Sequence, residues 1–237
     1  MSNGLGLNRC GLTRPLLIPN DLNVDINEAG KNWTELGEGD PMWVVLTAPD
    51  KSGNRWSEED FFETGRVEID EVFQKMANVG VVPATGKALD FGCGVGRLSQ
   101  ALAARFDSVD GVDISSSMIR HAEKLNRFPG KLNFHLNVRS DLATFPAGKY
   151  DFICSLIALQ HTPPEFQRAY LADFYRLLAP GGCAFFQTMR AAFVGWCRIG
   201  LRMGFENGGA RGRHSSRSTG SRLTTFFPRL IATTAAS

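Results

Sequence analysis

The stretch Lys87-Ala-Leu-Asp-Phe-Gly-Cys-Gly-Val-Gly-Arg-Leu98 indicates a buried strand that turns tightly into a helix. An apolar run ends in Asp90, and glycines follow at positions 92, 94 and 96. Glycine at such a turn lets a ligand approach the main chain, and the first amides of the following helix are free to donate hydrogen bonds. The stretch therefore predicts a ligand-binding turn, although an ordinary tight turn can carry the same glycines.

The spacing of these glycines separates two ligand classes. A dinucleotide site requires Gly-x-Gly-x-x-Gly, in which the third glycine lets helix and strand pack closely. Here the third glycine, Gly96, comes one residue early, and Arg97 occupies the expected place. The pattern therefore disfavours an NAD-dependent oxidoreductase and favours a ligand that is recognised mainly by carboxylates and backbone.

Carboxylates follow the next two expected strands. Asp113 ends the strand predicted at 108–112, where an acid can accept hydrogen bonds from both hydroxyls of a ribose. Alternatively, Asp113 only caps the helix that opens near Ser115. The strand predicted at 132–136 leads to Asp141, which can accept the amino group of an adenine or be a solvated loop acid.

Strand and helix signals alternate along this part of the chain. The expected strands are 88–91, 109–112, 132–136, 152–155 and 183–187, and the expected helices are 95–105, 116–125 and one that begins near Pro163. Such alternation predicts an α/β fold with a mostly parallel, doubly wound, Rossmann-like sheet. Ligands of these sheets bind beyond the carboxyl ends of the strands. One crevice can therefore gather Asp90, Asp113, Asp141 and Ser155.

Several motifs together resemble the class I S-adenosylmethionine-dependent methyltransferases over residues 56–189. They are Asp90-Phe-Gly-Cys-Gly-Val-Gly96, Gly111-Val-Asp-Ile-Ser115, Asp141-Leu142, Tyr150-Asp-Phe-Ile-Cys-Ser155, Leu159-Gln-His161 and Leu178-Ala-Pro-Gly-Gly182. The segment Leu159-Gln-His-Thr-Pro-Pro164 is similar to one in a bacterial subgroup that acts on small molecules or glycan-type acceptors.

The resemblance implies S-adenosylmethionine as cofactor and methyl transfer to an O or N atom of such an acceptor. In the family, the first acid and its glycines flank the methionine moiety, Asp113 holds the ribose, Asp141 and Leu142 border the adenine, and 155–161 face the sulfonium and the acceptor. The implied cofactor-binding residues are Asp90, Gly92, Cys93, Gly94, Gly96, Asp113, Ile114, Met118, Asp141, Leu142, Ser155 and Ile157.

A proton must leave if the acceptor is a hydroxyl or an ammonium group. His161 is the candidate base, because the free pKa of histidine lies near neutrality and His161 follows the fourth expected strand. Alternatively, His161 orders its loop or contacts the cofactor.

Composition agrees with one catalytic domain. The chain has 237 residues, 43% of them apolar, and a net charge of +2, which suits a single core with an N-terminal extension. Five cysteines, never spaced as Cys-x-x-Cys, argue against a disulfide framework or a zinc site and favour a reducing compartment. No apolar run approaches the roughly 18 to 20 residues that span a bilayer. We therefore expect a cytoplasmic protein without a metal or a membrane span.

The expected organisation has three parts. Residues 1–55, rich in Asn, Gly, Asp and Pro, suggest an irregular arm, and a helix begins after Ser57 at the start of the catalytic domain (56–189). We expect Gly65 to bend or interrupt this helix. A basic, low-complexity tail fills residues 190–237.

The tail departs from the family pattern. Residues 1–189 carry a net charge of −5, whereas the remainder has eight arginines, no lysine and one acid, a net charge of +7. The tail is a disordered arm for RNA or an anionic membrane surface, an atypical sheet edge, or the product of a changed reading frame. The sheet can therefore be incomplete at its C-terminal edge. Two alternative functions follow: a cofactor-binding protein with impaired turnover, or a nucleic-acid-associated protein that uses the tail.

Overall fold

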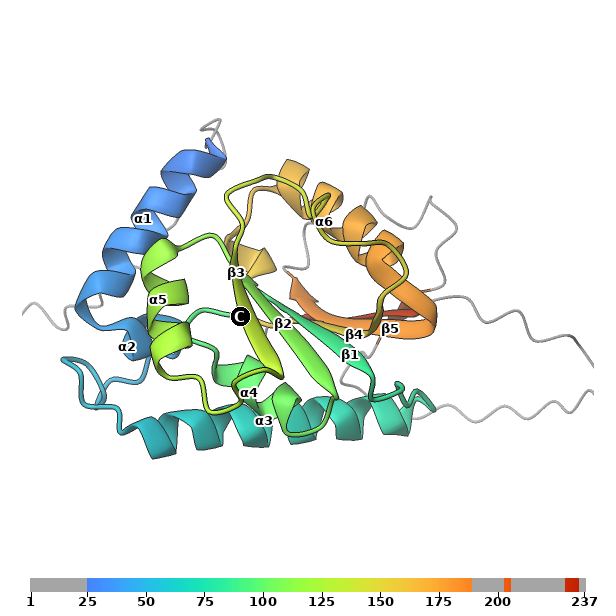
Figure 1. Ribbon diagram of the computed structural model, residues 1–237, viewed down its shortest axis with the longest axis horizontal. Coiled ribbons are helices and arrows are strands. Elements are labelled where there is room, and N and C mark those ends of the chain that lie inside the picture. Colours follow the sequence, from blue (N-terminus) through green and yellow to red (C-terminus); the bar gives the residue numbers. More distant parts are fainter. Residues whose placement is uncertain (1–24, 189–202, 206–228, 235–237) are drawn as a thin grey trace, which may run out of the picture.

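The computed structural model describes residues 25–188, 203–205 and 229–234 (Figure 1). A seven-stranded sheet with the order β3-β2-β1-β4-β5-β7-β6 lies at its centre, and every neighbouring pair is parallel. The first five strands are β1 (Lys87–Phe91), β2 (Ser108–Asp113), β3 (Leu132–Leu136), β4 (Tyr150–Ser155) and β5 (Leu178–Thr188). The strand order reverses between β1 and β4, which is the switch point where doubly wound sheets bind ligands. The predicted fold class is confirmed.

Helices cover both faces of the sheet (Figure 1). The elements are α3 (Glu58–Asn78), α4 (Arg97–Ala103), α5 (Ser116–Lys124), η1 (Leu159–His161) and α6 (Pro164–Leu177). One core layer packs α3 and α4 on the sheet and includes Ile69, Met76, Leu102, Phe106 and Phe152. The other packs α6 and includes Leu89, Ile153, Phe174, Leu177 and Phe186. These layers hold the strand ends in fixed positions.

Helix α3 begins as predicted but is not interrupted. Ser57 caps it by accepting a hydrogen bond from the backbone N–H of Asp60 at 3.1 Å. The expected break at Gly65 is wrong, because the helix runs through it. A Cβ atom at Gly65 would lie 2.3 Å from the backbone oxygen of Arg97. This glycine therefore allows close packing of α3 on the start of α4.

The expectation of an irregular arm up to residue 55 is wrong for most of its described part. The chain forms α1 (Ile26–Gly39) and α2 (Pro41–Val45) there. Asp25 caps α1 by accepting from the N–H of Asn27, and Asp40 caps α2, which has proline at its first position. These signals were obscured by the polar, glycine-rich composition of the segment.

The C-terminal edge of the sheet has two further strands. β7 (Arg229–Thr234) pairs with β5, and β6 (Met203–Phe205) pairs with β7. A short apolar run after Pro228 supplies the strand beside β5, so the described part of this edge matches the alternative of an atypical sheet edge and not that of an incomplete sheet. Most of the tail, at 189–202, 206–228 and 235–237, lies outside the described residues, and so do the predictions made for it. Within the described ranges, no helix is long and apolar enough to cross a membrane.

Candidate functional site

A cavity of about 170 Å³ lies at the carboxyl ends of β1, β2 and β4. The predicted site residues that line it are Asp90, Gly92, Cys93, Gly94, Asp113, Ile114, Met118, Ile157 and His161. The predicted residues Gly96, Asp141, Leu142 and Ser155 are not among its lining residues. The structure thus brings together most of the predicted set from three strand ends.

Asp113 joins the glycine turn to the end of β2. One carboxylate oxygen accepts the backbone N–H of Gly94 at 2.8 Å, and the other accepts that of Ser115 at 2.8 Å. Burial raises the pKa of Asp113, and these backbone hydrogen bonds oppose the rise. Asp113 therefore holds the residue that caps α5, Ser115, and also lines the cavity; its contact with a ribose stays a prediction.

At the glycines of the turn, the space that a Cβ atom would need is mainly occupied by side chains of the protein itself. Gly94 and Gly96 have φ of 52° and 86°, in the region that favours glycine. A Cβ atom at Gly94 would lie 2.6 Å from the side chain of Val45, and one at Gly96 would lie 2.7 Å from the ring of Phe134. Gly96 therefore serves the packing of β3 against the turn, which explains its absence from the cavity wall.

Asp90 is a buried carboxylate at the end of β1. It is 1% exposed and accepts a hydrogen bond from the hydroxyl of Ser99 at 2.6 Å. Burial raises the pKa of Asp90 to about 6, and the nearby charge of Asp113 adds to the rise, while Ser99 and Arg97 oppose it. The negative charge of Asp90 therefore destabilises the folded protein. A cation in the cavity would reduce this destabilisation.

Replacing Asp90 by asparagine should raise the free energy of unfolding and should weaken the binding of a cation in the cavity. The pKa of Asp90 is raised from 3.8 to about 6 on folding. The folded state therefore holds the proton more tightly, and stability falls as the pH rises through this window. Asp90→Asn removes the dependence, so we expect a gain of about 3 kcal/mol at pH 7.5. Urea unfolding at pH 4 and pH 7.5 measures it, with Asp107→Asn, an exposed site at the other end of β2, as control. A variant less stable than the parent at pH 7.5 would contradict the expectation.

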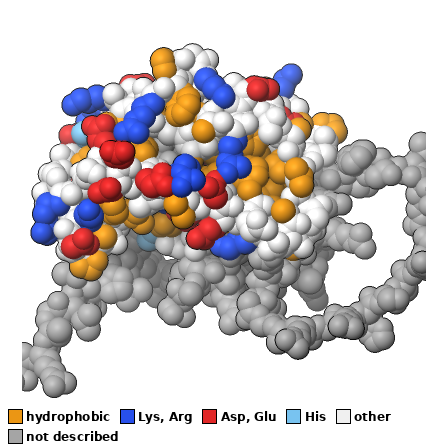
Figure 2. Space-filling model, turned by 90° about the horizontal axis from the view of Figure 1, so that it is seen from below, with side chains coloured by type: hydrophobic (Ala, Val, Ile, Leu, Met, Phe, Trp, Pro, Cys, Tyr) orange, Lys and Arg blue, Asp and Glu red, His pale blue; other side chains and the backbone are white. Residues whose placement is uncertain are grey.

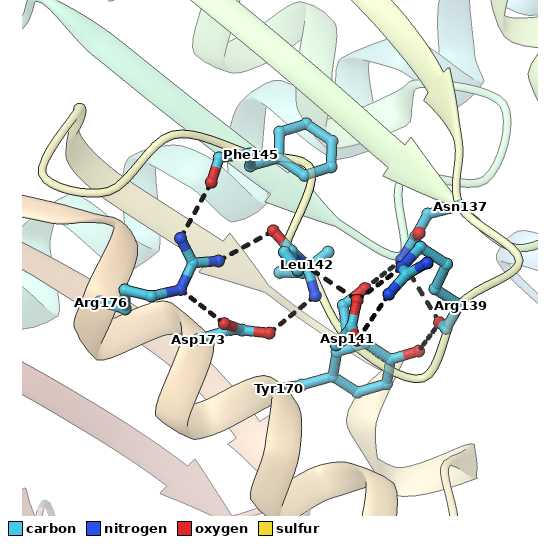
Figure 3. A network of polar contacts seen from close by, with 9 residues as sticks. Asn137, Arg139, Asp141, Leu142, Phe145, Tyr170, Asp173 and Arg176 are labelled. Atoms are coloured by element: carbon cyan, nitrogen blue, oxygen red, sulfur yellow. Dashed lines mark hydrogen bonds and ion pairs between the residues drawn. The ribbon is translucent and has the colours of Figure 1, made fainter.

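The loop after β3 lies beside the cavity and carries Asp141 and Leu142 (Figure 3). The carboxylate of Asp141 pairs with the guanidinium of Arg139 at 2.7 and 3.0 Å, and Leu142 is fully buried in the core. These contacts keep both side chains away from the cavity wall. Asn137 lines the cavity instead, and its amide donates to the backbone oxygen of Asp141 at 3.0 Å.

Helix α6 holds this loop through three side chains, and the first of them, Tyr170, donates from its hydroxyl to the backbone oxygen of Arg139 at 2.7 Å (Figure 3). Asp173 accepts the backbone N–H of Leu142 at 2.7 Å and pairs with Arg176 at 2.8 Å. Arg176 also donates to the backbone oxygens of Leu142 and Phe145, each at 2.9 Å. Asp173 and Arg176 therefore attach the loop after β3 to helix α6.

Arg176→Met is expected to lower the free energy of unfolding by about 2 kcal/mol, because it leaves two backbone oxygens and Asp173 without their charged partner. Arg66→Met is the matched control, since Arg66 also pairs with an acid three residues away but is exposed. We expect the control to lose less than about 1 kcal/mol. Urea denaturation measures both, and equal losses would show that Arg176 has no special role.

The segment after β4 forms the far wall of the cavity. Ile157 has φ of 67°, a strained conformation for a β-branched residue, and its N–H donates to the side chain of Gln187 at 3.2 Å. Nε2 of His161 lies 3.2 Å from the amide nitrogen of Gln160. Burial lowers the pKa of His161, so its imidazole is neutral at neutral pH. Ser155, just before this segment, is buried, and its hydroxyl has no partner among the described residues.

Several lining residues were not foreseen from the sequence. They include Ile26, Ala29 and Trp33 of α1, Val44 and Val45 of α2, and Arg97, Asn137 and Tyr170. The spacing of Ile26, Ala29 and Trp33 by three and four residues is a helical signal that identifies the face of α1. Arg97 is 3% exposed and pairs with Glu68 at 2.6 Å. Within the described residues, no group of three or more histidines, cysteines or acids could hold a metal ion.

Comparison with known proteins agrees with this geometry. A family model described as a methyltransferase domain matches residues 88–182. A ubiquinone biosynthesis O-methyltransferase of Psychrobacter arcticus is 32% identical over 181 residues, which are 72% of this chain and 66% of that protein. Its counterpart from Xanthomonas axonopodis is 28% identical and covers 60% of each chain. The chain thus spans at most 66% of the length of these relatives.

Solved structures share the fold. A phosphoethanolamine N-methyltransferase of Haemonchus contortus has a TM-score of 0.52 at 15% identity, with 66% of this chain and 31% of that chain covered. An S-adenosylmethionine-dependent methyltransferase of Leishmania major has a TM-score of 0.50 at 20% identity, covering 70% and 65%. Residues 88–182 therefore match a methyltransferase domain, and the chain shares the fold of these methyltransferases.

Proposed function

We propose that this chain transfers a methyl group from S-adenosylmethionine to an oxygen or nitrogen atom of a small-molecule acceptor. One observation carries the proposal: Asp90 and Asp113 converge on a single cavity at the glycine turn, and His161, whose pKa is lowered by burial, lines the same cavity. The names of the curated relatives, which specify O-methylation, favour oxygen.

The chemistry of the cavity fits this cofactor. Asp90, whose burial disfavours its charge, suits the cationic methionine moiety. Asp113 keeps lone pairs for ribose hydroxyls beside its two backbone donors. Ile114 and Met118 provide apolar surface for an adenine. We expect Gly92, Cys93 and Gly94 to contact the cofactor with their backbone, and Asp141, Leu142 and Gly96 to act only by shaping the walls.

The protein contributes mainly alignment and exclusion of water. S-adenosylmethionine supplies an activated methyl group, so alignment of the acceptor with it can provide about 7 to 11 kcal/mol. Residues of α1 and α2 line the cavity, and we expect them to limit the access of water to the bound cofactor. His161 accepts the proton of an acceptor hydroxyl, a role for which its lowered pKa keeps it unprotonated.

The proposal is tested with the full chain, methyl-labelled S-adenosylmethionine and a panel of hydroxyl and amino acceptors. Labelled product together with S-adenosylhomocysteine is the expected result. Binding of the cofactor without transfer to any acceptor would favour the alternative of a fold that has lost turnover. Absence of binding would overturn the proposal.

The surface supports a small-molecule acceptor more than a nucleic acid. Figure 2 shows acidic and basic side chains interspersed over the described part of one face. The ion pairs of Arg66 with Glu63 and Asp70 on α3 follow the same pattern. Nucleic-acid binding through the basic tail and the cytoplasmic location remain predictions, the latter supported by the buried free thiols of Cys93 and Cys154.

A further inference from the structure

The turn after β4 contains a strained residue, Ile157. Among the described residues other than glycine, only Asn54 and Ile157 have a positive φ, at 57° and 67°. Asparagine visits this conformation routinely, whereas the branched Cβ of isoleucine clashes with its own backbone there. Such strain persists only where the surrounding structure holds the residue, and it is typical of functional sites. The contacts of Ile157 and of the residues that follow it therefore indicate what this strain serves.

Two contacts hold this turn in place. The N–H of Ile157 donates a hydrogen bond of 3.2 Å to the side-chain oxygen of Gln187, at the end of β5. The next residue, Ala158, packs against the glycine turn after β1, where a Cβ atom at Gly92 would lie 2.2 Å from its methyl group. Strand β4 lies between β1 and β5 in the sheet. The turn after β4 is therefore fixed between the glycine turn and the end of β5.

The same turn places His161 at the cavity. The backbone oxygen of Ala158 accepts the N–H of His161 at 3.1 Å and the hydroxyl of Thr162 at 3.3 Å. Ile157, Ala158, His161 and Thr162 all line the cavity, and the ring of His161 contacts that of Trp33, with centroids 5.6 Å apart. The backbone conformation of Ile157 sets the direction in which the chain leaves β4. It therefore also sets the position of His161 in the cavity wall.

Gln187 projects from a paired part of the sheet and does not itself line the cavity. Its strand has a partner on each side, since Ser155 pairs with Phe186 and Gln187 pairs with Thr233. A side chain that projects from a paired strand is placed more precisely than one on a loop. The amide oxygen of Gln187 is therefore a fixed acceptor that acts on the cavity through Ile157.

We infer that Gln187 is a positioning residue for the methyl transfer, because its hydrogen bond to Ile157 keeps the turn after β4 in the conformation that holds His161 at the cavity. The inference rests on the proposed function and extends it to a residue outside the cavity. Without the amide oxygen, the N–H of Ile157 loses this partner and residue 157 can relax to a negative φ. The segment that follows would then leave the cavity wall, while Asp90 and Asp113, on β1 and β2, would keep their places.

Gln187→Met removes the amide oxygen and nearly keeps the length of the side chain. With S-adenosylmethionine and the most reactive acceptor of the hydroxyl and amino panel, we expect it to lower kcat about tenfold. It should change the binding of S-adenosylhomocysteine by less than about threefold. Gln187→Glu retains an oxygen acceptor and should keep most of the parent kcat, whereas Gln187→Leu should behave as Gln187→Met does. Gln74→Met, at an exposed position of α3, is the matched control and should keep the parent kcat. Parent kcat in both Gln187→Met and Gln187→Leu would overturn the inference.

Glycine at position 157 tests whether Gln187 acts through the backbone strain. Glycine adopts a positive φ without a steric cost, so it needs no hydrogen bond to hold that conformation. Within the Ile157→Gly background, Gln187→Met should therefore lower kcat by less than about threefold, against about tenfold in the parent background. Equal losses in the two backgrounds would overturn the inference, because Gln187 would then not act through the strain at Ile157.

A measurement without turnover separates this inference from the proposed function. Burial lowers the pKa of His161, which shares its cavity with the charged groups of Asp90, Arg97 and Asp113. When Gln187→Met releases the segment, the imidazole becomes more exposed and its pKa should rise toward 6.5, the ordinary value. NMR titration of the imidazole protons measures this pKa, with His161→Ala used to assign the signal. A rise in Gln187→Met but not in Gln187→Glu supports the positioning role whether or not an acceptor is methylated. An unchanged pKa in Gln187→Met would overturn that role and leave the methyltransferase proposal intact.

Discussion

His161→Ala should lower kcat by about 100-fold or more with an O-acceptor, because general base catalysis contributes factors of this size. His161 lines the same cavity as Asp90 and Asp113, and burial lowers the pKa of His161. A base must be unprotonated to act. In the parent protein the rate should therefore rise with pH, with its midpoint below pH 6.5, the usual pKa of histidine.

Initial rates at saturating cofactor and acceptor measure the loss, across pH 5 to 9. His121→Ala, which removes a histidine of α5 that does not line the cavity, is the matched control and should keep the parent rate. Binding of S-adenosylhomocysteine to His161→Ala reports whether the cavity is intact. Near-normal turnover of His161→Ala would leave His161 with a role in ordering the loop only.

Asp113→Asn should weaken the binding of S-adenosylhomocysteine by about 100-fold. Hydrogen bonds to a charged group contribute about 1.5 to 3 kcal/mol each, and a tenfold loss of affinity corresponds to about 1.4 kcal/mol. The asparagine also turns an N–H group toward one of the two backbone donors, at Gly94 or Ser115, that the carboxylate now accepts. The turn and the ribose site therefore lose a partner together.

Calorimetric titration measures this effect, with Asp107→Asn as a control that removes the same charge at the exposed start of β2. A 2′-deoxy analogue of S-adenosylhomocysteine sharpens the assignment. The analogue should bind the parent protein more weakly than S-adenosylhomocysteine does. The Asp113→Asn variant should bind the analogue and S-adenosylhomocysteine with about equal affinity. If Asp113→Asn lowers the affinity for both ligands by the same factor, the ribose does not bind to Asp113.

The sequence predicted the parts of the fold that depend on local signals. Alternating apolar strands and amphipathic helices gave the parallel sheet, and the acids that end β1 and β2 lie at one cavity because parallel strands end at the same edge. The glycine turn was predicted as well. The reason why glycine is needed there was only partly predicted, because side chains of Val45 and Phe134, from distant segments, occupy the space that Cβ atoms would need.

Other features depend on contacts between segments that are far apart. Arg176 and Asp173 reach the loop after β3 from α6, and no local pattern indicates such a clamp. The expected adenine contacts of Asp141 and Leu142 came from family spacing, whereas the Arg139 pair and the core hold these side chains away from the cavity. Trp33 lies in a polar segment, and its place in the cavity wall was not predicted. Its spacing from Ala29 and Ile26 is nevertheless typical of one face of a helix.

The glycine turn and the carboxylates of Asp90 and Asp113 should form one site for an adenosyl sulfonium compound. Calorimetric titration of the full chain with S-adenosylmethionine measures this binding. We expect a single site per chain with a dissociation constant on the order of micromolar to millimolar, full displacement by S-adenosylhomocysteine, and a raised unfolding temperature with ligand. A folded protein that shows neither heat of binding nor a shift in unfolding temperature at millimolar ligand would contradict it.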